Sequence, residues 1–210
     1  MTEVQSHGFV FEDWVKNTFF SGYKGGYSDK WDIPCEFNKK YGGIPVSIKT
    51  AKYGSTIGLG DACRQFDTKE NFLMIVGFWK QEGRYKRIVN ATAVIVEKEL
   101  WASLWKPITQ KDLIKLDSLI KNTSLHYTKV RKMAQELKKQ KPYSLSEITL
   151  NPKIDSKTQR RLQCGIKFNL YFDKIATKDS SEVNESPILW RIGVPKPWES
   201  ESRTFNKKSR

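Results

Sequence analysis

A lysine stands in the middle of an apolar segment, PVSIKTA, in the first quarter of the chain. Burying the ammonium of Lys49 costs free energy unless a partner replaces its water. Two acids precede it: Glu12 lies in the segment FVFEDWV, and Asp32 lies in KWDIP. If the segments containing Asp32 and Lys49 pair as antiparallel strands, both side chains reach the same end of the hairpin, and Glu12 can approach from a helix packed on it.

Two carboxylates beside an ammonium are suited to the hydrolysis of a phosphodiester. Mg²⁺ prefers carboxylate oxygens and water, neutralises the charge that develops on the phosphate, and makes hydroxide accessible near neutral pH. A lysine next to the metal orients or deprotonates the attacking water and stabilises the transition state. The grouping of Glu12, Asp32 and Lys49 therefore indicates metal-dependent nuclease chemistry.

These residues resemble the motif of the PD-(D/E)XK nuclease superfamily. The matching residues are Glu12 on an N-terminal helix, Asp32 as the first acid, and Ser47-Ile48-Lys49 in place of (D/E)XK. The resemblance covers roughly residues 8–79. It implies an α/β fold with a mixed central β-sheet flanked by helices, and Mg²⁺-dependent cleavage of DNA that leaves 5′-phosphates. It also implies that Asp32 and the Ile48 carbonyl are metal ligands and that Lys49 is the catalytic lysine.

The sequence departs from the motif at Ser47, where the superfamily has Asp or Glu. Serine has no charge and is a poor ligand for Mg²⁺. Asp61 in GLGDACRQ is our first candidate for the missing metal ligand, and Glu36 is the second. Glu12 is a further metal and catalytic candidate. Gln65 lies where similar nucleases often have a supporting polar residue.

The spacing of apolar residues predicts the elements that position these groups. In the first half we expect a helix over 7–20, a hairpin of strands 31–37 and 44–50 joined by a turn at 38–43, a glycine loop STIGLG, and a helix over 61–68. The apolar run FLMIVGFW is typical of a buried central strand, and RIVNATAVIVE supplies another. The order helix, hairpin, helix, strand resembles that of the core of this nuclease superfamily, which implies a restriction-endonuclease-like core.

The second half is predicted to be a helical and β elaboration of this core. Thr109 and Asp112 form a capping box, a basic helix follows and ends at Pro142, and strands are expected over 147–154 and 164–173 on either side of the polar insert SKTQRRLQ. We divide the chain into a nuclease core (1–105), a DNA-binding and dimerisation region (106–176) and a polar C-terminal tail (177–210). Within the tail, PILWRIGVPKPW is apolar enough to dock against another surface.

The charge of the chain favours a polyanionic partner. The net charge is +14; residues 1–105 have 14 Lys and Arg against 12 Asp and Glu, whereas residues 106–210 have 23 against 11. The residues expected to read base edges are Lys157, Gln159, Arg160, Arg161 and Gln163. Those expected to contact the DNA backbone are Lys52, Lys129, Arg131 and Lys132.

Several other site classes are disfavoured. The three cysteines, Cys35, Cys63 and Cys164, have neither the spacing of a zinc site nor that of a disulfide framework. His7 and His126 are isolated, and the STIGLG loop lacks the lysine of a nucleotide-binding loop. Without a signal peptide or an apolar run of membrane length, we expect a cytoplasmic protein.

The function predicted from the sequence is that of a type II restriction endonuclease, which hydrolyses both strands of a short DNA site with Mg²⁺. A homodimer is expected, because a twofold protein matches a palindromic site. Two alternatives stay open: a structure-specific repair or recombination nuclease, and a non-catalytic DNA-binding protein in which the acids are structural.

Overall fold

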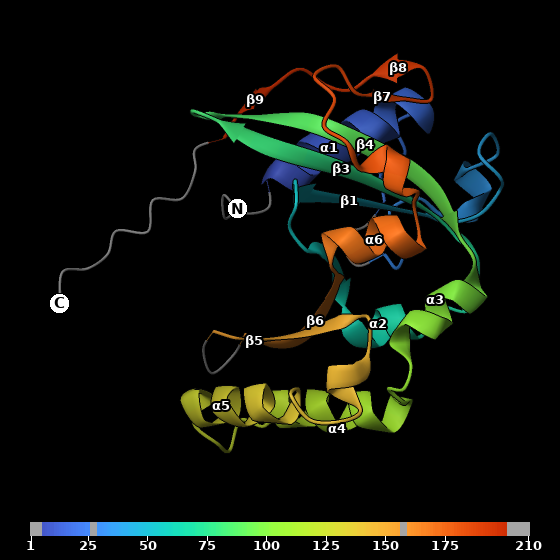
Figure 1. Cartoon of the computed structure of the whole chain (residues 1–210). Coiled ribbons are helices and arrows are strands. Elements are labelled where there is room, and N and C mark those ends of the chain that lie inside the picture. Colours follow the sequence, from blue (N-terminus) through green and yellow to red (C-terminus); the bar gives the residue numbers. More distant parts are fainter. Residues whose placement is uncertain (1–5, 26–28, 156–158, 201–210) are drawn as a thin grey trace.

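The chain forms an α/β fold in which a mixed β-sheet is flanked by helices. A computed structural model describes residues 6–25, 29–155 and 159–200 (Figure 1). The helices are α1 (Ser6–Phe19), α2 (Ala62–Phe66), α3 (Lys98–Trp105), α4 (Gln110–Lys121), α5 (Tyr127–Leu137) and α6 (Phe168–Lys174). The longer strands are β1 (Val46–Lys52), β2 (Ile57–Asp61), β3 (Phe72–Glu82), β4 (Tyr85–Val96), β5 (Thr149–Ile154) and β6 (Arg160–Ile166). The α/β class predicted from the sequence is confirmed, including the mixed sheet and its flanking helices.

The mixed sheet, sheet A, has the strand order β1-β3-β4-β9, where β9 is the short strand Trp198–Glu199. Strand β1 runs parallel to β3, while β3, β4 and β9 pair in antiparallel fashion. The apolar run FLMIVGFW forms the buried part of β3, as predicted. Strand β1, which contains Lys49, therefore lies at an edge of the sheet.

Two hydrophobic layers cover the two faces of sheet A. On one face, Phe11 and Val15 of α1 pack against Val46 and Ile48 of β1. The approach is closest at Gly77 in β3, where a Cβ atom would lie 2.9 Å from ring atoms of Phe11. Figure 1 shows α1 on this side and α2, α4 and α5 on the other. Because side chains alternate along a strand, Ser47 and Lys49 extend from the face opposite α1.

A second sheet, sheet B, has the antiparallel order β2-β6-β5. Its buried side chains belong to the same hydrophobic cluster as those of α4 and α5, which lie below β5 and β6 in Figure 1. Strand β2 comes from the predicted nuclease core and β6 from the predicted elaboration. The two halves of the chain thus share one sheet.

The capping box predicted at the start of α4 is confirmed. The Thr109 hydroxyl accepts a hydrogen bond from the Asp112 backbone N–H at 3.3 Å, and the Asp112 carboxylate accepts one from the Thr109 N–H at 2.9 Å. Hydrogen bonds from the Thr109 side chain and backbone lower the pKa of Asp112 below its ordinary value. The start of the helix is therefore stabilised by an ionised carboxylate.

Replacing Thr109 by alanine is expected to lower the free energy of unfolding by about 1 kcal/mol at neutral pH. A lowered carboxyl pKa stabilises the fold fully above the ordinary pKa, and this contribution is lost as pH falls through the lowered pKa. The difference between wild type and Thr109→Ala should thus shrink in acid. Urea unfolding at neutral and acidic pH measures it, with the exposed Thr123→Ala as the matched control; an equal loss in both variants would contradict the capping role.

The C-terminal region docks on sheet A and α1 as far as residue 200. Trp190 stacks on Tyr41 with ring centroids 3.8 Å apart and packs edge-on against Phe19. Strand β9 extends sheet A beside β4, and the Asn90 amide donates to the Ser180 carbonyl at 2.6 Å. The expectation that PILWRIGVPKPW docks is confirmed. The short strands here are β7 (Ile188–Leu189) and β8 (Ile192–Gly193), after the 3-10 helix η3 (Lys178–Ser181).

The predicted hairpin around Asp32 is wrong. Ile33 forms only an isolated antiparallel bridge with Val46, and the chain then turns into the 3-10 helix η1 (Cys35–Phe37). Pro34 lacks an N–H with which to continue a ladder. The Asn38 side chain is fully buried and donates to the Ile44 carbonyl at 2.7 Å, so it fixes a closed loop instead of a tight turn.

Further elements also differ from the sequence prediction. Part of the STIGLG loop is strand β2, because Ile57 and Leu59 are buried in alternation with glycines. The segment predicted as strand 164–173 is instead the end of β6 followed by α6. The polar insert predicted between the two strands contains the first residues of β6. Helix α3 was not predicted. None of the described helices has the length and apolar character needed to cross a membrane.

Candidate active site

The Lys49 ammonium lies between a carboxylate and a carbonyl oxygen at the free edge of β1. Its Nζ donates to Asp32 Oδ2 at 3.0 Å and to the Ile48 carbonyl oxygen at 3.0 Å. Asp32 Oδ2 also accepts the Ile48 backbone N–H at 2.6 Å. The Lys49 and Asp32 side chains are 19% and 27% exposed, so the pair is sheltered yet still open to solvent on one side. The structure therefore brings together Asp32, Ile48 and Lys49.

The segment that contains Asp32 is held on both sides of the acid. After it, Ile33 and Val46 exchange backbone hydrogen bonds of 3.2 and 2.8 Å. Before it, the Trp31 indole N–H donates to Glu70 Oε1 at 3.1 Å, and the Trp31 ring lies 5.1 Å from that of Phe72 in β3. These contacts fix Asp32 beside β1 although no continuous strand does so.

Helix α3 contacts Phe72, the β3 residue on which Trp31 of this segment packs. Trp101 is fully buried, and its ring packs edge-on against that of Phe72 with the ring centroids 5.1 Å apart. Its indole N–H donates to the Gln65 carbonyl oxygen of α2 at 2.9 Å. Gln65, the predicted supporting residue, is itself buried in α2. Trp101 thus connects α2 with β3, and Phe72 of β3 in turn contacts Trp31 of the Asp32 segment.

The other predicted acids of the first half have separate partners. Glu12 accepts from Lys16 at 2.6 Å within α1, which covers the face of sheet A opposite Lys49. Glu36 accepts a hydrogen bond from the Cys35 thiol at 3.4 Å in η1 and is exposed. Ser47 lies on the same face as Lys49 and is buried. In the described structure, therefore, neither Glu12 nor Glu36 contacts the Asp32–Lys49 pair.

Asp61 lies at the end of β2 and caps α2, where its Oδ1 accepts the Arg64 backbone N–H at 2.8 Å. Burial raises the pKa of the Cys164 thiol; the negative charge of Asp61 raises it further, and the positive charge of Lys49 lowers it. Of the acids proposed to compensate for Ser47, Asp61 lies on β2, a strand that contacts β1.

The donors at the site fit a hard divalent cation with an incomplete protein shell. Asp32 supplies a carboxylate and Ile48 a carbonyl oxygen, and both already converge on one positive charge. Within residues 6–25, 29–155 and 159–200, no three His, Cys, Asp or Glu side chains gather as a metal cluster. Mg²⁺ typically keeps several waters and binds one or two carboxylates together with substrate phosphate, so this donor set is compatible with it.

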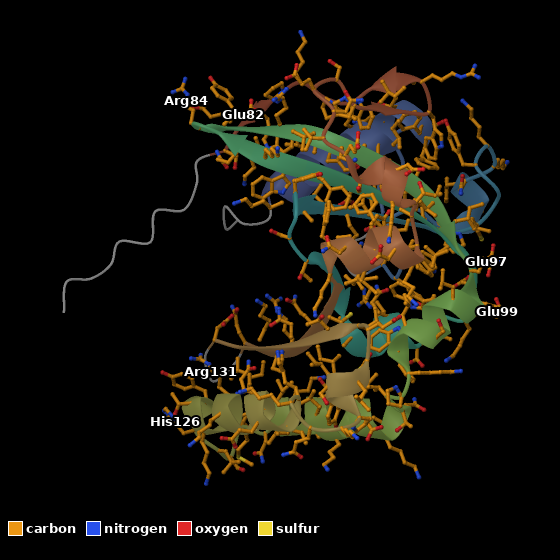
Figure 2. The ribbon with its side chains drawn as sticks, viewed as in Figure 1. Glu82, Arg84, Glu97, Glu99, His126 and Arg131 are labelled. Carbon is orange, nitrogen blue, oxygen red and sulfur yellow. The ribbon has the colours of Figure 1, made fainter. Side chains whose placement is uncertain are left out.

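Two arginines predicted to contact DNA instead bind the protein's own carbonyl groups. Arg160 is buried; its guanidinium donates to the Leu125 carbonyl at 3.1 Å and also to the Asn122 carbonyl, which fixes the loop between α4 and α5. Arg131 reaches from α5 to the end of β5, where Nε donates to the Ile154 carbonyl at 3.1 Å (Figure 2). Both side chains therefore have structural contacts in the free protein.

The remaining predicted DNA-binding residues lie at the surface or beside it. Exposed residues among them are Lys52 at the end of β1, Lys129 and Lys132 on α5, Gln159, and Arg161 on β6. Gln163 on β6 is half-buried. Lys157 lies outside the described residues. These side chains are spread over both sheets and α5, so they do not form one patch.

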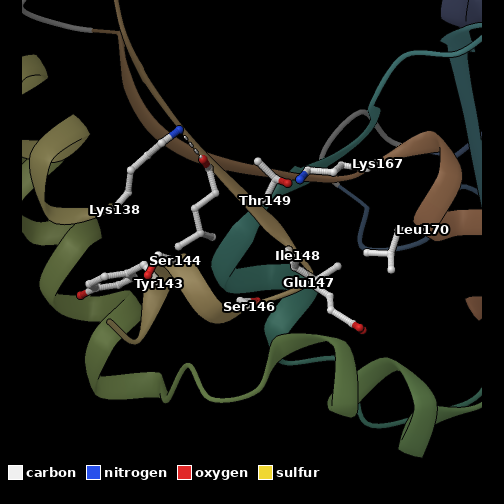
Figure 3. Close-up of a pocket in the computed structure, with 10 residues that line it drawn as sticks. Lys138, Tyr143, Ser144, Ser146, Glu147, Ile148, Thr149, Lys167 and Leu170 are labelled. Atoms are coloured by element: carbon white, nitrogen blue, oxygen red, sulfur yellow. Dashed lines mark hydrogen bonds between the residues drawn. The ribbon is translucent and has the colours of Figure 1, made fainter. Parts of the chain in front are cut away.

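A cavity of about 420 Å³ lies apart from the Asp32–Lys49 pair, between α5, β5 and α6 (Figure 3). Lys138, Glu147 and Lys167 contribute charged groups to its lining. The Lys138 ammonium donates to the Leu150 carbonyl at 3.1 Å, so one of the two lysines is already engaged. Neither Asp32 nor Lys49 lines this cavity.

The positioning residues Trp31, Glu70 and Trp101 were not identified from the sequence. Trp31 directly precedes Asp32, but the spacing of residues in the sequence does not indicate that Trp31 contacts Phe72 of β3 and Glu70 of the preceding loop. Comparison with known proteins adds no family assignment: no family model matches the sequence, and neither a curated protein nor a solved structure matches the chain.

Proposed function

We propose that this protein is a Mg²⁺-dependent endonuclease that hydrolyses phosphodiester bonds in double-stranded DNA, of the type II restriction kind. The observation that supports this proposal most strongly is the Lys49 ammonium, held 3.0 Å from both the Asp32 carboxylate and the Ile48 carbonyl oxygen. These are the three groups to which the superfamily resemblance assigns the chemistry. Ile48 and Lys49 lie on the edge strand β1 of a mixed sheet, and Asp32 lies in the segment beside it. All three come after an N-terminal helix and before α2, in the order the resemblance implies.

Asp32 and the Ile48 carbonyl would hold the Mg²⁺ ion, with Asp61 as the first candidate to supplement them. When bound, the metal would supply charge neutralisation at the phosphate and a nucleophilic hydroxide near neutral pH. Asp32 has a second role in the protein itself: its carboxylate accepts the Ile48 N–H at 2.6 Å, which fixes the carbonyl of the same residue at the strand edge.

Lys49 would act on the reacting phosphate. An ammonium at this position donates hydrogen bonds to the non-bridging oxygens and to the attacking water, and its charge stabilises the extra negative charge of the transition state. The Lys49 side chain is 19% exposed, so it is partly open to solvent in the free protein. Substrate can therefore approach the ammonium without unfolding the sheet.

A second candidate is a non-catalytic DNA-binding protein. The same contacts favour it. The Asp32 carboxylate accepts the Ile48 N–H, which faces the edge of the sheet, and also neutralises the Lys49 charge. These contacts are those of a structural ion pair. The net charge of +14 suits either function. A nuclease that prefers branched DNA, by contrast, has the same active-site chemistry and differs only in substrate.

Plasmid cleavage separates these candidates. Supercoiled plasmid incubated with the purified protein and Mg²⁺ is expected to yield discrete fragments, and EDTA should abolish the reaction. Mapping the ends should place every cut at one short sequence with 5′-phosphates. Preferential cutting of a four-way junction over plasmid would identify a structure-specific nuclease. Intact plasmid and intact junction with Mg²⁺ and Mn²⁺ would contradict the proposed activity and favour a binding protein.

A further inference from the structure

Sheet B presents one polar face whose side chains lie in register across its strands. Asn151 of β5 pairs with Gln163 of β6, and Lys153 pairs with Arg161. Residues directly opposite each other in antiparallel strands point to the same face. Asp61 of β2 lies on the other side of Gln163, in the same row. The intervening residues of β5 and β6 are buried toward α4 and α5.

Two positive charges face each other on this surface. Lys153 and Arg161 are direct cross-strand partners, and like charges in this arrangement destabilise a sheet. Neither side chain, nor Asn151 or Gln163 beside them, has a hydrogen bond or ion pair with another described residue. Among the described residues, no ion pair offsets the repulsion between Lys153 and Arg161, and a bound anion would relieve it.

The four side chains have the chemistry that reads base edges. Arginine and lysine donate to the O6 and N7 atoms of guanine, and asparagine and glutamine pair with the N6 and N7 atoms of adenine. The major groove of B-DNA admits a two-stranded β-ribbon. Here the ribbon is β5–β6, with two cations in one cross-strand pair and two amides in the next. Arg160, one residue before Arg161, points to the buried face and is excluded from this set.

We propose that the polar face of β5–β6 enters the major groove of duplex DNA and that Asn151, Lys153, Arg161 and Gln163 contact base edges there. This inference rests on the proposed function for its substrate and assigns sequence recognition to a surface separate from the catalytic pair. Asp61, next to Gln163, is the last residue of β2, and β2 contacts β1, the strand that contains Lys49.

Selection from a random pool of 30-base-pair duplexes, performed in EDTA, tests the ribbon without requiring cleavage. The wild-type protein is expected to enrich one short sequence. Asn151→Ala, Lys153→Ala, Arg161→Ala and Gln163→Ala should each lower the affinity ratio between the enriched and a scrambled duplex by about 5- to 150-fold. The matched controls are Asn169→Ala and Lys178→Ala, both exposed and outside the ribbon, which should keep the ratio.

The possible outcomes distinguish recognition from catalysis. Circular dichroism should show that all variants fold, because the substituted side chains lie outside the hydrophobic core. An equal loss of affinity for both duplexes would mean phosphate contact only and would overturn the proposal, as would an unchanged ratio or a wild type that enriches no sequence. A protein that selects a sequence but never cuts contradicts the nuclease and not the ribbon. One that cuts with an unchanged preference after these substitutions contradicts the ribbon alone.

Discussion

Replacing Lys49 by alanine is expected to lower the single-turnover rate of duplex cleavage by about 10²- to 10⁴-fold, the range typical of a group that transfers a proton or stabilises transition-state charge. Asp32→Asn should cause a loss of the same order, because it removes the negative charge at the proposed metal ligand. The amide oxygen of asparagine can still accept the Ile48 N–H, which Asp32 Oδ2 accepts at 2.6 Å. The loss of rate therefore reports on chemistry and not on the strand edge.

Stability measurements distinguish this outcome from simple unfolding. The Lys49–Asp32 pair is partly exposed, at 19% and 27%, and such an ion pair contributes about 1 kcal/mol or less to stability. Both variants should thus unfold in urea near the wild-type midpoint. Asp173→Asn and Lys178→Ala, which break a surface acid–lysine pair of 3.3 Å, are the matched controls and should keep the wild-type rate. Wild-type rates for Lys49→Ala and Asp32→Asn would contradict the catalytic assignment.

Lys49→Arg offers a finer comparison. Arginine keeps the positive charge but replaces a compact ammonium by a planar guanidinium with a different geometry. If charge alone were needed, the arginine variant would retain most of the rate. We expect a rate between those of wild type and Lys49→Ala, because Nζ must lie 3.0 Å from two oxygens at once.

Replacing Trp101 by alanine is expected to produce the largest loss of stability, about 3–5 kcal/mol, as for other buried tryptophans. Trp101 is fully buried, contacts Phe72 edge-on at 5.1 Å, and donates to the Gln65 carbonyl at 2.9 Å. The alanine variant leaves a cavity among these groups and a buried carbonyl without its donor. Urea unfolding measures the loss directly.

Trp101→Phe is the matched variant for that experiment. Phenylalanine keeps the ring packing on Phe72 but removes the indole N–H, so its loss should be about 1–3 kcal/mol, smaller than for alanine. Phe72 also packs on Trp31, next to Asp32. The cleavage rate of Trp101→Phe at 25 °C should therefore fall by more than the loss of folded protein accounts for. A loss below about 1 kcal/mol in Trp101→Ala would show that Trp101 does not connect these elements.

The elements that the sequence predicted correctly depend on strong local signals. A continuous apolar run specifies β3, and the Thr109–Asp112 capping box marks the start of α4. The errors arose where local signals compete. Phe168, Tyr171 and Phe172 have a helical spacing and form α6, whereas the sequence prediction places them in a β-strand. Ile57 and Leu59 alternate with glycines, and because glycines are typical of turns, the sequence predicted a loop where the structure has β2.

The candidate site was predicted in part for a similar reason. The order of Asp32 and Ser47-Ile48-Lys49 in the sequence was sufficient to predict that Asp32, Ile48 and Lys49 lie together. The hairpin that was expected to join their segments is only one bridge. The partner of Glu12 was visible as well: Lys16 lies four residues later, the spacing of a helical ion pair. The Trp31–Phe72 contact depends on the tertiary fold and has no signature in the sequence.

The polar face of β5 follows a pattern that is visible in the sequence. In LNPKI, buried Leu150, Pro152 and Ile154 alternate with Asn151 and Lys153. Period two of this kind indicates a strand with one solvent face, and it would have added Asn151 and Lys153 to the candidates for base contacts. It would also have separated Arg160 from Arg161, since adjacent residues point to opposite faces.

The binding of Mn²⁺ tests most directly the central claim that Asp32 and the Ile48 carbonyl hold a divalent ion beside Lys49. The protein is mixed with a phosphorothioate duplex that resists cleavage, and the EPR signal of free Mn²⁺ is followed during titration. Wild type is expected to bind Mn²⁺, and Asp32→Asn, which keeps the fold, is expected to bind it at least about tenfold more weakly. Equal Mn²⁺ affinity in the two proteins, or no binding to either, would contradict the account.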